Sequence, residues 1–115
     1  MKILVTDGDN RAALAITRSL GRAGHFVIVS APTAQSLAGM SRYCRRRFVY
    51  PDPHRAPAEF CVELLRFVQK EKPDVLMPVS EITTILVARY MKLLGRHCRI
   101  PFPEADIVQN AADKA

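Results

Sequence analysis

Short β-rich apolar runs alternate along this chain with stretches of helical periodicity, and this alternation restricts its fold more than any other feature. Strands are predicted over residues 3–6, 26–30, 47–50 and 75–79, and a further short edge strand over residues 98–100. Strands that alternate with helices form a mostly parallel sheet covered by helices on both faces. The sequence therefore predicts an α/β fold, a three-layer, Rossmann-like open sheet of four to five strands.

The predicted helices fill the intervals between these strands. A helix is predicted over residues 11–23, capped by Asp9 or Asn10 and stopped at Gly24. A short helix is predicted over residues 36–43, and a helix over residues 81–95 that ends near Gly95. The long helix between them is marked by an apolar stripe, formed by Phe60, Cys61, Leu64, Leu65 and Val68, and Lys72-Pro73-Asp74 closes it.

Composition places the chain among ordinary globular proteins. Its 115 residues fit one domain, with 49% hydrophobic and 24% charged residues. No run is long enough for a membrane span, and the first strand leaves no room for a cleavable apolar leader. The three cysteines, Cys44, Cys61 and Cys98, show no paired spacing, so reduced thiols are expected, with Cys61 in the core. We expect a cytoplasmic location and no membrane partner.

The turn after the first strand lacks the glycines that a dinucleotide pyrophosphate requires. Only Gly8 is present in this turn, whereas the dinucleotide fingerprint needs three spaced glycines. The chain also has no phosphate-binding GxxxxGK[ST] loop, no recognisable nucleophile motif and no metal-ligand spacing of its three histidines. We therefore expect no NAD, no metal held by this chain and no catalysis by the chain alone.

Three polar segments follow predicted strands and should meet at one edge of the sheet. They are residues 7–11, 31–33 and 80–84, and ligands of open parallel sheets bind at this carboxyl edge. The candidate substrate-binding residues are Asp7, Gly8, Asn10, Arg11, Ser80, Glu81 and Thr83, with Glu81 able to receive a cationic amine. A simpler interpretation stays open, in which Ser80, Asp9 and Asn10 cap helices and Glu81 complements a helix dipole.

An arginine run contributes much of the formal net charge of +6. Arg42, Arg45, Arg46 and Arg47 are interleaved with Tyr43, Phe48 and Tyr50, a pattern that superficially suits nucleic acid. A solvated edge of helix and strand, with Phe48 in the core, is the favoured interpretation. We expect no nucleic-acid partner.

The order of several segments resembles the N-terminal domain that precedes the ATP-grasp module in carboxylate-amine ligases and their relatives, such as biotin carboxylase and the carbamoyl phosphate synthetase large chain. The segments that carry this resemblance are Ile3-Leu4-Val5-Thr6-Asp7-Gly8, Leu20-Gly21-Arg22-Ala23-Gly24-His25, Ser41-Arg42-Tyr43-Cys44, Tyr50-Pro51-Asp52-Pro53, Asp74-Val75-Leu76-Met77-Pro78-Val79-Ser80-Glu81, Ile100-Pro101-Phe102-Pro103 and Asp113-Lys114. Each is unspecific alone, but their order and spacing cover the whole chain.

The resemblance implies a pre-ATP-grasp, Rossmann-like domain over residues 1–103, with residues 104–115 starting the connection into an ATP-grasp domain that this sequence does not contain. Such a domain forms one wall of the site for a small carboxylate or amine substrate. ATP and magnesium are held mainly by the later domains, and Lys114 matches a family lysine that commonly approaches the nucleotide. Relatives of this type are often dimers, so a homodimer is an expected state.

A second hypothesis belongs to another functional class. A free-standing Rossmann-like regulatory module would recognise a nucleotide or an anionic partner through residues 42–47. A small oxidoreductase is disfavoured, because Ser30-Ala31-Pro32 stands where a ribose-binding carboxylate would follow the second strand.

Overall fold

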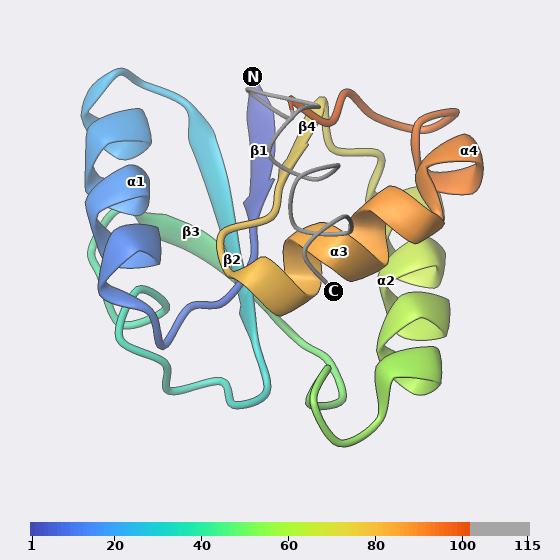
Figure 1. Cartoon of the computed structure of the whole chain (residues 1–115). Helices are drawn as coiled ribbons and strands as arrows, with labels where there is room; N and C mark the ends of the chain where they lie inside the picture. The colour runs from blue at the N-terminus through green and yellow to red at the C-terminus, as the bar shows by residue number, and fades with distance from the viewer. Residues whose placement is uncertain (102–115) are drawn as a thin grey trace.

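The sheet is built from four parallel strands (Figure 1). The computed structural model describes residues 1–101. The strands are β1 (Lys2–Val5), β2 (Phe26–Ala31), β3 (Cys44–Val49) and β4 (Val75–Met77), in the order β3-β2-β1-β4. In the centre of the sheet, Leu4 of β1 pairs with Ile28 on one side and Leu76 on the other. The predicted open, Rossmann-like α/β fold is confirmed.

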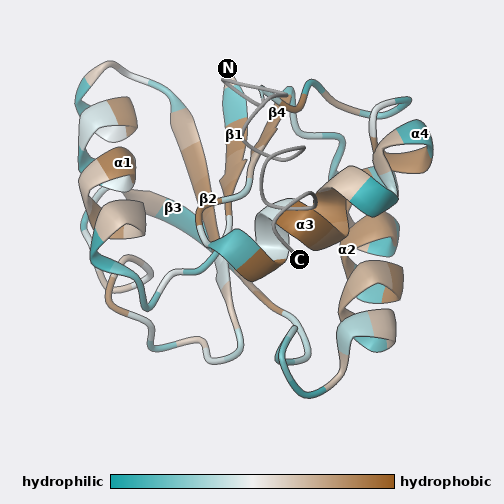
Figure 2. Cartoon of the chain, viewed as in Figure 1, coloured by the Kyte–Doolittle hydropathy of each residue, from teal (hydrophilic) through white to brown (hydrophobic). Residues whose placement is uncertain are grey.

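Helices cover both faces of this sheet (Figure 1). Helix α1 (Arg11–Arg22) lies on one face, and α2 (Pro57–Glu71), α3 (Glu81–Arg89) and α4 (Met91–Leu94) lie on the other. Successive strand residues point to opposite faces, so Ile3 and Val5 join the α1 core while Leu4 joins the α2 core. Strands β1, β2 and β4 are mostly hydrophobic, whereas edge strand β3 carries hydrophilic residues (Figure 2). Burial of each such side chain contributes about 1.5–3 kcal/mol.

The ends of the first two helices follow the predicted signals. Asn10 caps α1, where its Oδ1 accepts the Ala12 N–H at 2.8 Å, and Gly24 follows the helix with a φ of 90°. Helix α2 starts with Pro57 and ends at a left-handed Lys72, φ 51°. Its apolar stripe is buried as predicted, and Cys61 is 8% exposed.

The helix predicted over residues 36–43 is wrong, because the segment forms a series of turns. Its backbone makes other hydrogen bonds: Ala38 N–H donates to the Gly8 carbonyl at 2.8 Å, and Gly39 N–H donates to the Ser36 hydroxyl at 3.1 Å. A side chain that bonds nearby backbone groups competes with helix formation. The connection from β2 to β3 is therefore a loop packed onto the first turn.

Two strand boundaries differ from prediction by more than one residue. β3 starts at Cys44 rather than at residue 47, because the arginines lie on an edge strand where charged side chains reach solvent. β4 stops at Met77, two residues early, since Pro78 has no N–H to donate to a ladder. Phe48 is partly buried, stacked on Phe67 of α2 with 3.9 Å between ring centroids.

The helices and the strand after β4 are shorter than predicted. The predicted helix over residues 81–95 is interrupted at Tyr90, where the backbone leaves helical geometry, and α4 ends at Gly95 as expected. The edge strand predicted over residues 98–100 is reduced to one parallel bridge between Arg99 and Val75. No helix within residues 1–101 is both long enough and apolar enough to cross a membrane. The proline connector beyond residue 101 and the final helical stretch, 106–115, lie outside the described residues.

Candidate functional site

The candidate site lies at the carboxyl edge of the sheet, where β1 and β4 end and α1 and α3 begin (Figure 1). Asp7 follows β1 by two residues and adopts a left-handed backbone, with a φ of 60°. Non-glycine residues occupy this region infrequently, and aspartate and asparagine are enriched there. This conformation directs the chain out of the sheet directly beside the start of α3.

The Asp7 carboxylate accepts hydrogen bonds from two separate elements. Its Oδ2 accepts the Thr83 hydroxyl at 2.6 Å, the Ser80 N–H at 2.9 Å and the Thr6 hydroxyl at 2.5 Å. Its Oδ1 accepts the Ser80 hydroxyl at 2.9 Å. We call Thr6, Asp7, Tyr50, Ser80 and Thr83 the Asp7 cluster. It joins the end of β1 to the start of α3 across more than 70 residues of sequence.

This arrangement occupies the N-terminus of α3 with a carboxylate of the protein itself. The N–H groups of Val79 and Ser80 point at Asp7, and the Ser80 hydroxyl accepts the Thr83 N–H as an N-cap. Helix N-termini attract anions through such N–H groups and the helix dipole. Asp7 therefore places a negative charge beside this helix end, bonded to the N–H groups that directly precede Glu81.

Tyr50 belongs to the cluster although the sequence pattern marked it only as the end of a strand. Its hydroxyl accepts the Asp7 N–H at 3.0 Å, and its ring is 2% exposed and packs edge-on against Phe60 at 4.6 Å. Burial, aided by the Asp7 charge, raises the pKa of Tyr50 well above its usual value. The one signal in the sequence was its place directly after β3, at the same edge as residues 7 and 80.

Gly8 packs closely against the loop of residues 36–43. It is buried, and an added Cβ would lie 2.3 Å from the Ser36 hydroxyl and 2.8 Å from a Val29 methyl group. Its N–H donates to the Ser30 carbonyl at 2.9 Å. The first turn therefore needs glycine so that the 36–43 loop can pack onto it.

The exposed polar groups of the edge flank the Asp7 cluster on its two sides. Asp9, Asn10 and Arg11 lie at the start of α1, and Glu81 is the exposed first residue of α3. Asn10 and Ser80 both act as helix caps, as the simpler interpretation expected. The structure thus brings Asp7, Ser80 and Thr83 into direct contact, and leaves Arg11 and Glu81 accessible to a ligand.

Three residues of the arginine run lie on edge strand β3, and Arg42 precedes this strand. Several of these arginines contact neighbouring side chains. Arg46 pairs with Glu71 at the end of α2, and Arg45 stands 5.5 Å above the Phe26 ring. Arg42 lies 5.0 Å above the Tyr43 ring. Hydrogen bonds from Arg42, and then from Arg22, hold the pKa of Tyr43 below its usual value.

Metal-binding chemistry is not visible in the part of the chain that the structure describes. Within residues 1–101, no three His, Cys, Asp or Glu side chains gather in a way that could hold a metal ion. Lys114, the candidate nucleotide-binding residue, lies outside the described residues.

Comparison with known proteins supports the fold. No protein-family model matches this chain, and no curated protein matches it. Among solved structures, the chain is similar to glycinamide-RNase-transformylase T from Mycobacterium tuberculosis, with a TM-score of 0.70 and 16% sequence identity. The similarity covers 95% of this chain and 28% of that chain, so this chain spans little more than a quarter of the transformylase length. At this identity the likeness shows a shared fold.

Proposed function

We propose that this chain is the substrate-wall domain of an ATP-dependent carboxylate-amine ligase, or a related ligase, and that it is not catalytic alone. The shared fold over 95% of the chain with the transformylase, a member of the ATP-grasp family, is the observation that carries this proposal. The order of segments that resembles a pre-ATP-grasp domain supports it independently. Residues 104–115, including Lys114, would lead into the ATP-grasp body.

We assign ATP and magnesium to the ATP-grasp domain that the resemblance implies, where ATP would phosphorylate the substrate carboxylate to an acyl phosphate. Across the described residues, 1–101, no three His, Cys, Asp or Glu side chains gather in a way that could hold a metal ion. The part left to this chain is the binding and orientation of the substrate.

The role of this chain is to position the small carboxylate or amine substrate. Glu81 is exposed at the start of α3 and presents a carboxylate that can pair with a cationic amine. Arg11, at the start of α1, offers a guanidinium that matches a substrate carboxylate. The Asp7 cluster lies between them and holds the two helix starts in a fixed relation.

The proposal is tested in the native polypeptide that carries this chain, by measuring ADP release with a panel of carboxylates and amines. We expect Glu81→Gln to raise the KM for the amine about tenfold and to leave the KM for ATP within about twofold. Glu59→Gln, an equally exposed charge loss in the first turn of α2, is the matched control. An unchanged amine KM would refute the role of Glu81.

The assignment as a wall domain has its own test. The chain of residues 1–115 should release no ADP under the same conditions. Turnover by this chain alone would overturn the proposal, and so would a native polypeptide of only this length, detected by mass in its source cells. Either result would favour the free-standing binding module.

A further inference from the structure

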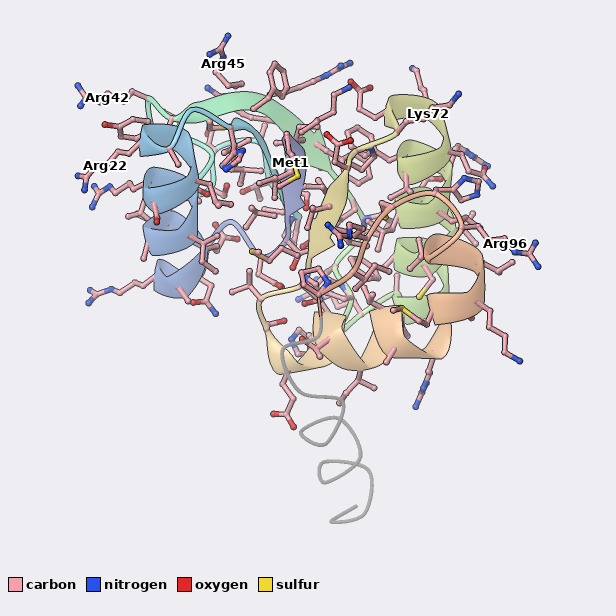
Figure 3. All side chains as sticks on the ribbon, turned by 90° about the horizontal axis from the view of Figure 1, so that it is seen from above. Met1, Arg22, Arg42, Arg45, Lys72 and Arg96 are labelled. Carbon is pink, nitrogen blue, oxygen red and sulfur yellow. The ribbon has the colours of Figure 1, made fainter. Side chains whose placement is uncertain are left out.

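The opposite edge of the sheet, where the strands begin, is strongly basic. Figure 3 looks onto this amino edge and shows Arg22, Arg42 and Arg45 on one side of Met1 and Lys72 and Arg96 on the other. The cationic side chains that belong to this amino edge are Lys2, Arg22, Arg42, Arg45, Arg46, Lys72, Arg96 and Arg99. We call these residues the basic edge.

Nearby negative groups do not neutralise the positive charge of the basic edge. Helices α1 and α2 run back toward this edge, and their C-termini supply about −0.5 charge each, whereas α3 lies across the sheet (Figure 1). Among the described residues, Glu71 pairs with Arg46 and Lys2, and the Asp74 carboxylate accepts the backbone N–H of Lys2 at 2.7 Å. Together these groups offset fewer than half of the cations, so within residues 1–101 the basic edge keeps an excess of about five charges.

A shallow groove runs through part of the basic edge. It has a volume of about 750 Å³. Its lining includes the cationic Lys72, Arg96 and Arg99, one acidic residue, Asp74, which accepts the backbone N–H of Lys2, and the apolar Met91 and Ile100. Basic groups at its rim can meet carboxylates, while the apolar lining offers contact to hydrocarbon side chains. A phosphodiester backbone would gain nothing from the apolar part of this lining.

The arginines on the other side of Met1 are held in place by aromatic rings. Arg45 stacks over Phe26, and Arg42 stacks over Tyr43 and donates to its hydroxyl at 3.0 Å. Stacking against a ring restricts a guanidinium while leaving N–H groups to face an anion. An extended ligand is needed to reach both these arginines and the groove, because they lie on opposite sides of Met1 (Figure 3).

We propose that the basic edge is a docking surface for an extended acidic segment of a partner protein, in which acidic residues alternate with apolar ones. The carboxylates would contact Lys72, Arg96 and the stacked arginines, and the apolar side chains would enter the groove. This surface lies at the edge remote from the Asp7 cluster, so it can be occupied without covering Arg11 or Glu81.

The test uses a fluorescein-labelled peptide of alternating Glu and Leu, with binding to residues 1–115 followed by fluorescence anisotropy at several salt concentrations. We expect binding that weakens with salt. The variant Lys72→Glu/Arg96→Glu should weaken it about tenfold. The control Arg18→Glu/Arg55→Glu makes the same change of net charge at exposed positions outside the basic edge and should change the affinity less than about twofold.

Three results would overturn the proposal. Equal loss of affinity in both double variants would show attraction to net charge alone. Tighter binding of an oligodeoxythymidine of the same charge than of the peptide would identify a nucleic-acid surface instead. Absence of peptide binding at low salt, with circular dichroism showing a folded chain, would exclude the docking surface.

Discussion

Removing the Asp7 carboxylate should lower the free energy of unfolding. The geometry around Asp7 allows this loss to be divided into separate contributions. In Asp7→Ala the Ser80 N–H loses its acceptor, at a cost of about 1–3 kcal/mol for a donor left unsatisfied. Alanine at a φ of 60° adds roughly 1–2 kcal/mol of backbone strain. The Thr83 hydroxyl keeps the Ser80 carbonyl as an acceptor at 3.1 Å, so it adds little. The expected loss is about 2–5 kcal/mol.

Two further substitutions at the same position separate these contributions. Asp7→Asn keeps an oxygen for the donors around Oδ2, and its amide can donate to the Ser80 hydroxyl, so only the charge is lost, at about 1 kcal/mol. Asp7→Gly removes the side chain without the strain, and should be about 1 kcal/mol more stable than Asp7→Ala.

The assay is urea unfolding followed by far-ultraviolet circular dichroism, with the free energy of unfolding extrapolated to water. Asp9→Asn, two residues along and exposed, is the control and should change stability by less than about 0.5 kcal/mol. The reasoning is refuted if Asp7→Ala costs no more than this control, or if Asp7→Gly is less stable than Asp7→Ala.

Three other predictions concern stability and its dependence on pH. Gly8→Ala places a Cβ 2.3 Å from the Ser36 hydroxyl and should cost about 1–3 kcal/mol, and Ser36→Ala should restore part of the loss in urea unfolding. Tyr50→Phe leaves the Asp7 N–H without its acceptor and should lower the free energy of unfolding by about 1–3 kcal/mol, whereas no change would mean that another acceptor replaces the hydroxyl. Burial raises the pKa of the Cys98 thiol from 9 to about 11, so the folded state holds this proton more tightly than the unfolded chain does. Stability should therefore fall as the pH rises from 9 to about 11, and Cys98→Ala should reduce the slope of urea midpoint against pH; an identical slope would contradict this assignment.

The fold class could be predicted because the apolar runs of β1, β2 and β4 suit only buried parallel strands between helices. The turns over residues 36–43 could not be predicted, because the conformation of this segment depends on contacts with residues distant in sequence. Leu37 and Met40 have a helical spacing, yet they are 45% and 62% exposed. The Gly8 carbonyl, thirty residues earlier, accepts the Ala38 N–H and holds this segment against the first turn.

The site was predictable in its position and less so in its chemistry. The rule that ligands meet parallel strands at their carboxyl ends brought Asp7, Ser80 and Thr83 to one edge, where the structure places them in contact. The sequence does not show the direction in which a carboxylate points, so the hydrogen bonds between Asp7 and the start of α3 were not predicted. Tyr50 was missed for a related reason. It follows β3, which is separated from β1 by β2, so its hydroxyl contacts Asp7 across the end of β2.

The central position of β1 also determines when the domain can fold during its synthesis. β1 pairs with β2 soon after both have been made, but its other neighbour, β4, begins at Val75. At about 5–20 residues per second, the ribosome needs roughly 2–9 s to add the residues between β2 and β4. During that interval one edge of β1 has no partner, and the carboxylate of Asp7 has not yet met Ser80 or Thr83. The growing chain therefore passes through a stage with an open apolar strand edge, which is prone to pair with other chains.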